Sequence, residues 1–455
     1  MAAAAAVPAG PPGGRLMGNM REFNRDTLGF VERCAREFGD VVSTRFLYVP
    51  AYFIYHPEDI EYVLASGSKN FIKPLSFRTP FFLRLVGNGL LTSEGDFWRR
   101  QRRLAQPAFH RERVHAYGRT MVELAGRACE GWKDGRIIDA HAEMMLLTQS
   151  IVARTLFSAD VSGDAREIGR ALETIIRPFS SQATVRWILD NRLPTPNHLR
   201  FNRAVRKIDR FVYRLISERR QSGEDTGDLL SMLLHAQDEE GDGKGMTDKQ
   251  LRDELMTLFL AGHETTALAL TWTWHLLARN PEAEARLHAE LDTVLGGREP
   301  SVEDLPALRY AEWVIKESMR LFPPAYGVGR EAARECEIGG YRVPEGMQIF
   351  AFTWVVHRDP RWYDEPERFL PERWREEEAA RRPKFSYFPF GGGPRQCIGN
   401  SFAMMEAVLA LATIARRFRL TSVAGRPVEI RPALSLRPGA GVYLKPEKRF
   451  PAVSR

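Results

Sequence analysis

The spacing of apolar and polar residues predicts a chain that is mostly helical. Residues 24–38 predict an amphipathic helix, and residues 56–66 predict another with Pro57 in its first turn. Helical patterns then dominate from 94 to 220. The breaks in that stretch fall near 133–137, 158–164 and 193–196, and further helices are expected over 247–279, 281–295, 301–321 and 401–417.

Strand signals are short. Residues 41–55 predict two strands around a Val-Pro turn, while residues 326–353 and 419–449 predict strands and turns. Residues 69–92 predict an irregular loop that is rich in Phe and Leu, and an apolar loop must be covered or must itself cover a pocket. The expected fold class is therefore mainly α with small β-sheets.

The longest predicted helix, 247–279, would measure about 50 Å at ~1.5 Å per residue, which is enough to cross a whole domain. It begins with Thr247 and Gln250 at the spacing of a capping box. The sequence contains no internal repeat. We therefore expect a flexible N-terminal lead over 1–23 and a single domain over 24–455.

The composition favours a large core and disfavours nucleic acid as a partner. Hydrophobic residues make up 44% of the 455 residues, and the net charge is +7. A nucleic-acid surface would need a basic stripe with interleaved aromatic residues, and none is present. The densest basic cluster, Arg99, Arg100, Arg102 and Arg103, predicts a solvated face or a docking patch for an acidic protein.

The four cysteines, Cys34, Cys129, Cys336 and Cys397, lie far apart and form no Cys-x-x-Cys pair. This spacing excludes zinc-ribbon and thioredoxin-like motifs. So few cysteines in so long a chain fit a reducing cytoplasm. Since no apolar stretch reaches the ~20 residues that span a bilayer, we expect a cytoplasmic protein without a transmembrane anchor.

One cysteine stands in a glycine-rich stretch, FGGGPRQCIG at 390–399. An apolar helix is predicted after this stretch, so Cys397 lies near a helix N-terminus, whose partial positive charge favours the thiolate. The full positive charge of Arg395 acts in the same direction. A thiolate on a loop whose glycines admit a flat group is suited to ligate an iron porphyrin. For an isolated cysteine, a buried structural role is the commoner explanation.

A polar cluster interrupts the apolar centre of the longest predicted helix at AGHETT, residues 261–266. His263 and Glu264 begin a zinc-protease motif, but Ala267 stands where the second histidine is required, so that motif is excluded. Glu264 and Thr265 predict an acid–alcohol pair that delivers protons to bound dioxygen in a local opening of the helix. A polar kink with satisfied hydrogen bonds is the alternative.

Two other pairs carry no specific signal by themselves. Glu317 and Arg320 lie three apart on a predicted helix, which is the spacing of an ordinary surface ion pair. Trp98 and Arg102 lie four apart on another helix, where packing is the usual reason.

Together these motifs resemble those of the cytochrome P-450 haem-thiolate monooxygenases, over residues 24 to 448. FGGGPRQCIG fits the family signature Phe-x-x-Gly-x-Arg-x-Cys-x-Gly at every fixed position. AGHETT matches the oxygen-activating motif of the central helix, and ESMR at 317–320 matches the family's Glu-x-x-Arg. The segment HRDPRWYDEPERFLPERW at 357–374 resembles the stretch before the haem loop, with Trp374 where Phe is usual.

The resemblance implies the cytochrome P-450 fold, with a long central helix over one haem b whose iron is ligated by Cys397. It also implies that Glu317, Arg320 and Arg373 form one buried charge network that supports the haem loop. Arginines suit the haem carboxylates because their forked donors pair with them. The residues that the resemblance places at the cofactor are Trp98, Arg102, Ala261, Arg330, Phe390, Gly391, Arg395, Cys397 and Gly399.

The implied reaction inserts one oxygen atom from O2 into a hydrophobic substrate, by hydroxylation or epoxidation, with Thr265 and Glu264 as the catalytic pair. The substrate class stays open among fatty acids, terpenoids, carotenoids and polyketides. A haem-thiolate isomerase or peroxygenase, or a non-catalytic haem-binding protein, are the alternatives. The predicted substrate pocket comprises Phe71, Phe77, Leu90, Ala261, Ala325, Val328 and Leu436, with the helices around 193–196.

Electrons would come from NAD(P)H through a ferredoxin reductase and a ferredoxin, because no reductase module follows the haem helix in this sequence. An acidic ferredoxin would dock on the run Arg99–Arg103 with Arg416 and Arg417. We expect the protein to be a monomer.

Overall fold

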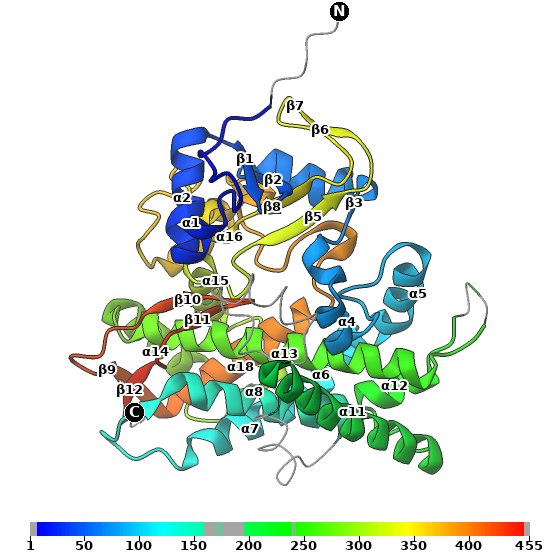
Figure 1. The fold of residues 1–455 in the computed structure, drawn as a ribbon. Helices are drawn as coiled ribbons and strands as arrows, with labels where there is room; N and C mark the ends of the chain where they lie inside the picture. The colour runs from blue at the N-terminus through cyan, green and yellow to red at the C-terminus, as the bar shows by residue number, and fades with distance from the viewer. Residues whose placement is uncertain are drawn as a thin grey trace, which may run out of the picture.

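The computed structural model describes residues 7–158, 171, 174, 195–238, 241 and 243–449. Helices make up most of it, and a five-stranded sheet lies with α1 and α2 at one end (Figure 1). Among the described residues, no helix is both long and apolar enough to cross a bilayer. The helices are α1 (Met20–Arg25), α2 (Thr27–Phe38), α3 (Pro57–Glu61), α4 (Pro80–Val86), α5 (Gly95–Ala105), α6 (Arg111–Ala116), α7 (Gly118–Glu130), α8 (Ala140–Phe157), α11 (Pro196–Ser222), α12 (Leu229–His235), α13 (Asp248–Leu277), α14 (Pro281–Leu295), α15 (Arg309–Leu321), α16 (Thr353–Val356), α17 (Glu376–Ala380) and α18 (Asn400–Arg417).

The largest sheet has the strand order β1-β2-β8-β5-β3, in which only the β2–β8 pair is parallel. Three smaller sheets pair β10 with β11, β6 with β7, and β12 with both β4 and β9. The strands are β1 (Val41–Phe46), β2 (Val49–Ile54), β3 (Phe71–Ile72), β4 (Ile138–Asp139), β5 (Val328–Ala332), β6 (Cys336–Ile338), β7 (Tyr341–Val343), β8 (Gln348–Ala351), β9 (Phe418–Ser422), β10 (Ile430–Pro432), β11 (Leu436–Pro438) and β12 (Tyr443–Lys448).

The mainly helical class with small sheets is confirmed, and α13 crosses the centre of the molecule (Figure 1). Its first turn carries the predicted capping box, in which the side chains of Thr247 and Gln250 each accept the other's main-chain N–H. Helix α8 lies along α13, and both α15 and α18 contact it. The centre of α13 is therefore enclosed by other helices.

Three local predictions differ from the structure. The β1–β2 turn lies at Leu47 and Tyr48, and Pro50 belongs to β2, because Leu47 adopts a left-handed conformation with φ 58° and Pro50 pairs with Arg45. The stretch 69–92 contains α4, whose Pro80 occupies the first helical turn. The single helix predicted over 24–38 is divided at Asp26, whose side chain caps α2.

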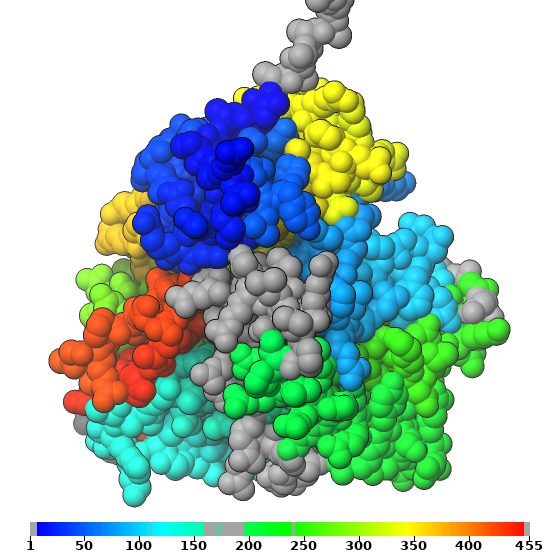
Figure 2. Space-filling view, in the orientation of Figure 1, coloured from blue at the N-terminus to red at the C-terminus, as the bar shows by residue number. Residues whose placement is uncertain are grey.

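The predicted flexible lead, 1–23, is attached to the fold over its described part. Asn19 donates its main-chain N–H to the Arg45 carbonyl at 2.7 Å, and Ser43 donates to Ala9 at 3.0 Å. In the space-filling view these N-terminal residues cover the same end of the molecule as the yellow strands near 340, away from α11 and α12 (Figure 2). Main-chain hydrogen bonds to β1 therefore hold the described N-terminal residues in place.

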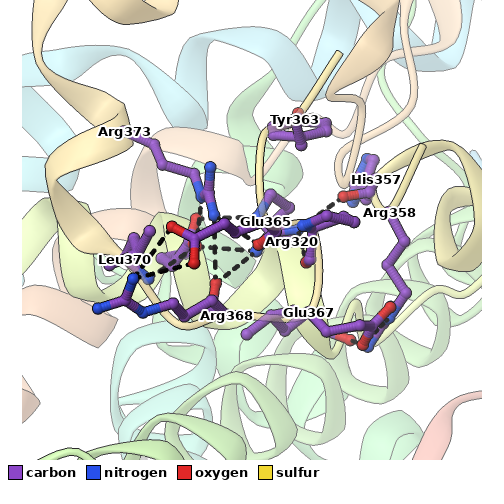
Figure 3. Close-up of polar contacts among 12 residues, drawn as sticks. Arg320, His357, Arg358, Tyr363, Glu365, Glu367, Arg368, Leu370 and Arg373 are labelled. Atoms are coloured by element: carbon purple, nitrogen blue, oxygen red, sulfur yellow. Dashed lines mark hydrogen bonds and ion pairs between the residues drawn. The ribbon is translucent and has the colours of Figure 1, made fainter. Parts of the chain in front are cut away.

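A buried charge network joins α15 to the segment that precedes the Cys397 loop. The Glu317 carboxylate accepts hydrogen bonds from Arg320 at 2.8 Å and from Arg373 at 3.1 Å, and all three side chains are nearly or fully excluded from solvent. Figure 3 shows Arg320 and Arg373 directed to the same point, with Leu370 beside them. The structure thus brings together the three residues that the motifs predicted.

Two contacts extend this network. The Trp374 indole N–H donates to Glu317 at 3.0 Å, a bond that the Phe usual at this position could not make. Arg320 also donates to the His357 carbonyl at 2.8 Å, and the His357 ring accepts the main-chain N–H of Phe388 at 3.0 Å. Phe388 lies two residues before the glycine-rich stretch. The network therefore fixes the chain that leads into the cysteine loop.

We expect Glu317→Gln to lower the free energy of unfolding by about 3–5 kcal/mol, because it leaves two buried guanidinium groups without a counter-charge. The measurement is urea-induced unfolding. Glu365→Gln is the matched control, since Glu365 forms an exposed ion pair with Arg368 and should contribute less than about 1 kcal/mol. Equal small losses in both variants would contradict the structural role of Glu317.

Candidate active site

The cysteine loop contains two glycines in a left-handed backbone conformation, which residues with a Cβ rarely adopt. Gly391 and Gly393 have φ values of 68° and 64°, and a Cβ on Gly393 would lie 1.9 Å from the Leu64 carbonyl oxygen. The Cys397 main-chain N–H donates to the Phe390 carbonyl at 3.0 Å and closes the loop. Helix α18 begins three residues later and carries the apolar face that anchors the loop in the core.

The Cys397 side chain borders a cavity and is exposed to solvent there, although protein atoms surround it closely. Burial raises the pKa of Cys397 above its usual value, although the Gly399 N–H and the Arg102 guanidinium act in the opposite direction. The expectation that the helix N-terminus and Arg395 would favour the thiolate is therefore wrong for the protein chain alone, because desolvation outweighs them. Coordination to a metal ion would deprotonate the thiol.

The cavity has a volume of about 350 Å³ and mostly apolar walls. Leu91, the helices α8 and α13, and the segment before β5 form one side, and the cysteine loop with the start of α18 forms the other. The predicted residues that border it are Ala261, Thr265, Ala325, Val328, Arg330, Phe390, Gly391, Arg395, Cys397 and Gly399.

Three cations meet at one end of this cavity. Burial, with the nearby charges of Arg330 and Arg395, lowers the pKa of Lys73 well below its usual value. Burial likewise lowers the pKa of Arg330 to about 10. The carboxylate that offsets them is Glu94, which pairs with Arg395. Within the described residues, this excess of positive charge beside an apolar cavity and a thiol fits a flat apolar group with two carboxylates, as haem b has.

Other predicted residues lie outside the cavity wall. Phe71 and Leu90 are buried in separate apolar clusters, and Phe77 packs edge-on against Phe82 at 4.7 Å. The Leu436 backbone instead binds the segment that forms the wall, through its N–H to the Pro324 carbonyl at 2.9 Å. Loop neighbours such as Leu91 and Pro324 occupy the wall in their place. Predicted pocket helices around 193–196 lie partly outside the described residues.

Trp98 and Arg102 lie behind the cysteine loop and line a surface groove. The Arg395 guanidinium stacks over the Trp98 ring at 4.1 Å, and Arg102 donates to the Gln396 carbonyl at 3.0 Å. Arg102 therefore brings a positive charge to the outer side of the loop. In this structure both residues act on the loop, and neither borders the cavity.

At the centre of α13, Thr265 faces the cavity and donates its hydroxyl to the Ala261 carbonyl at 2.6 Å. The helix continues through this point, so the predicted local opening is limited to that hydroxyl contact. Gly262 packs closely on α8, since a Cβ there would lie 3.3 Å from the Val152 side chain, a tight contact. A threonine on a continuous helix thus lines the same cavity as Cys397.

Glu264 has a partner that the sequence did not suggest. Its buried carboxylate accepts a hydrogen bond from Arg437 at 2.6 Å and another from Ser435, both on the β10–β11 hairpin. Glu264 does not line the cavity as Thr265 does. The only sequence signal was an Arg and a Ser in a short strand-turn stretch, and no local pattern links it to α13.

The basic run on α5 is largely occupied by internal contacts. Arg100 and Arg103 both pair with Asp238, which is buried. Arg416 and Arg417 pair with Glu299. Arg99 remains at the surface with the exposed Asp96 as its partner. Most of these arginines therefore hold segments of the chain together.

With this geometry in place, comparison with known proteins identifies the class. The cytochrome P450 family model matches residues 8–448. The cyclooctatin synthase of Streptomyces melanosporofaciens is 40% identical, and the match covers 96% of this chain and 95% of that protein. The cyclooctat-9-en-7-ol 5-monooxygenase of the same organism is 39% identical over 90% and 88% of the two chains. The pentalenene oxygenase of Streptomyces avermitilis is 36% identical over 89% of each.

Among solved structures, the crystal structure of the cytochrome P450DA heme domain matches with a TM-score of 0.89 and 25% identity, over 99% of this chain and 100% of that one. The chain belongs to the cytochrome P450 family. It is a haem-thiolate monooxygenase with iron protoporphyrin IX as its cofactor and a hydrophobic molecule and O2 as its substrates.

We expect Arg437→Leu to lower the free energy of unfolding by about 3 kcal/mol, because Glu264 is left as a buried carboxylate with Ser435 as its remaining partner. Adding Glu264→Gln should restore most of that loss, which a double-mutant cycle in urea measures. Arg431→Leu on the same hairpin is the control, since its ion pair with Glu429 is exposed. Additive losses in the double variant would contradict a direct Glu264–Arg437 interaction.

Proposed function

We propose that this monooxygenase oxidises a cyclic terpenoid at a carbon held above Cys397. The observation that carries this proposal is the mostly apolar wall of the Cys397 cavity, which the haem and the substrate would share. Its wall offers hydroxyl groups from Thr265 and Thr266 and otherwise mostly hydrocarbon, which suits a rigid hydrocarbon or its monohydric alcohol. The names of two relatives specify such compounds, pentalenene and cyclooctat-9-en-7-ol.

In this proposal Cys397 ligates the haem iron, and Lys73, Arg330 and Arg395 hold the haem carboxylates. Their partly uncompensated charge supports that assignment. Trp98 and Arg102 support the loop from behind. When bound, the haem thiolate supplies the oxidising chemistry, in which electron donation from the thiolate favours O–O cleavage. The protein chain then has two tasks, to orient the substrate and to deliver protons.

Proton delivery falls to Thr265 and Glu264. The Thr265 hydroxyl lies in the cavity and is oriented by the Ala261 carbonyl, so it can donate to a small polar group there once that contact breaks. Glu264 is one residue away but is held by Arg437 and Ser435. It can act only if that pair opens or if water links it to Thr265.

The electron donor is a separate acidic ferredoxin with its reductase. The proposed docking surface uses only part of the basic run Arg99–Arg103, because Arg100 and Arg103 pair with Asp238. Arg99 and Arg102 line the groove behind the cysteine loop and are the remaining cations of the run. A monomer that folds as one domain over 24–455 in the cytoplasm stays a prediction.

The test of substrate class is a screen of cyclic terpene hydrocarbons and alcohols for the spin-state shift that follows loss of the iron-bound water. Compounds that cause the spin-state shift are then incubated with the enzyme, ferredoxin, ferredoxin reductase and NAD(P)H. The proposal expects an oxygenated product that depends on NAD(P)H. A shift with fatty acids alone would overturn the terpenoid assignment, and turnover supported by peroxide alone would indicate a peroxygenase.

We expect Thr265→Ala to consume NAD(P)H while forming product less efficiently, because the proton donor in the cavity is lost. Product per NAD(P)H should fall by on the order of 10²-fold, the lower end of general acid–base contributions. Thr271→Ala is the matched control, since that buried hydroxyl makes the same type of helix contact, to Ala267 at 2.6 Å. Full coupling in Thr265→Ala would exclude the proposed role.

Arg99→Glu should slow electron transfer from the ferredoxin by about tenfold at low salt, and the deficit should shrink as salt rises, because screening weakens the charge contact. Stopped-flow reduction at several ionic strengths measures it. Arg206→Glu on α11 controls for net charge, since Arg206 is also exposed. If both variants slow equally, or neither does, α5 is not the docking surface.

A further inference from the structure

The segment between α4 and α5 is fastened to α13 by two consecutive carboxylates. Asp253 accepts the main-chain N–H of Asn88 at 2.9 Å, and Glu254 accepts that of Leu90 at 3.0 Å. The second oxygen of Glu254 accepts the side-chain amide of Gln101 on α5 at 3.1 Å. One α13 side chain therefore joins the segment and the helix that follows it.

The segment is built for this close approach. Gly87 has a φ of 64°, and a Cβ there would lie 2.0 Å from the Asp253 carboxylate. A Cβ on Gly89 would lie 2.6 Å from the Thr257 hydroxyl. Figure 1 shows α4 beside α13, in agreement with their contacts. Glycine at both places is thus a requirement of the contact with α13.

Leu91, the next residue after the second bond, lines the cavity. Beyond it the chain is tied to the cysteine loop, because Arg395 donates to the Ser93 carbonyl at 2.8 Å and pairs with Glu94. Leu91 is consequently held between an attachment to α13 and an attachment to the Cys397 loop. Its position in the wall depends on both.

We propose that Glu254 is a positioning residue that holds Leu91 in the wall of the substrate cavity and so sets the shape of the space above Cys397. The inference rests on the proposed function only in taking this cavity as the substrate site. Asp253 has its own cations, Lys249 at 2.6 Å and Arg252 at 3.0 Å. Glu254, in contrast, is fully buried and accepts from neutral donors.

This difference makes the Glu254 contact sensitive to pH. Burial raises the pKa of Glu254 to about 7, opposed by the two hydrogen bonds and assisted by the charge of Asp253. Arg100 on α5 contacts Gln101, the side-chain partner of Glu254, at 3.3 Å. A protonated Glu254 presents a hydroxyl to two donors, so one of its two contacts is lost. The segment should loosen as the pH falls through about 7.

Stability and cavity order should respond in opposite directions. Since the folded pKa lies above the unfolded value near 4.5, this group stabilises the fold most at low pH, and that contribution is lost as the pH rises through about 7. The order of the segment that carries Leu91 should improve as the pH rises over the same range. If Glu254 had a purely structural role, the stability of the fold and the order of this segment would change in the same direction.

The experiment compares the wild-type holoenzyme with Glu254→Gln between pH 6 and 8. Two probes are used. One is hydrogen exchange of peptides covering 86–93, corrected for intrinsic rates. The other is the affinity for the neutral form of 4-phenylimidazole, a nitrogen ligand of haem iron that enters the cavity, corrected for the protonation of the free ligand. In the wild type, protection and affinity should rise about tenfold with pH, while stability relative to the variant falls. Glu254→Gln should show no such pH dependence in either probe.

Asp248→Asn is the control, since Asp248 lies on the same helix in an exposed ion pair with Arg220 and should keep the wild-type profile. A Glu254→Gln enzyme with the wild-type pH profile of exchange and affinity would overturn the inference. So would a wild type whose segment is protected equally at pH 6 and 8. Because 4-phenylimidazole is not a terpenoid, failure of the substrate assignment would leave both probes readable.

Discussion

The carboxylate of Glu317, which has no access to water, is the contact on which the site depends. A buried charge is tolerated only when it is paired and fully hydrogen-bonded. Glu317 meets this condition by collecting Arg320, Arg373, Trp374 and the Leu370 N–H from separate parts of the chain. The same cluster reaches the approach to the cysteine loop through His357. The position of the thiol is therefore set by an interaction far from any substrate.

Helix α13 supplies the opposite side of the site, and each of its parts has a different partner. Near its start, Asp253 and Glu254 hold the segment that carries Leu91. At its centre, Thr265 enters the cavity while Glu264 turns to Arg437. A single helix thus carries the residues that hold one wall of the cavity and the residues proposed to deliver protons. The distance between these two groups is therefore fixed.

Local signals in the sequence predicted much of this architecture. The capping box marked the start of α13, and the Cys397, Glu317 and Thr265 motifs lie where one common site requires them. Remote partners could not be predicted. Arg437 is 173 residues from Glu264, and its role follows from tertiary contact alone. Leu90 was predicted instead of its neighbour Leu91 because the sequence does not show which of the two side chains borders the cavity. The direction of the Cys397 pKa was missed because burial is not visible in a motif.

The central claim is that Cys397 is the iron ligand at the floor of this cavity. The most direct measurement is the absorbance spectrum of the reduced, CO-bound holoprotein for the wild type, Cys397→Ser and Cys336→Ser. Cys336 is a matched control because it is a free cysteine outside the cavity. The account predicts that the long-wavelength band of thiolate ligation is present in the wild type and Cys336→Ser and absent in Cys397→Ser. Retention of that band in Cys397→Ser would contradict it.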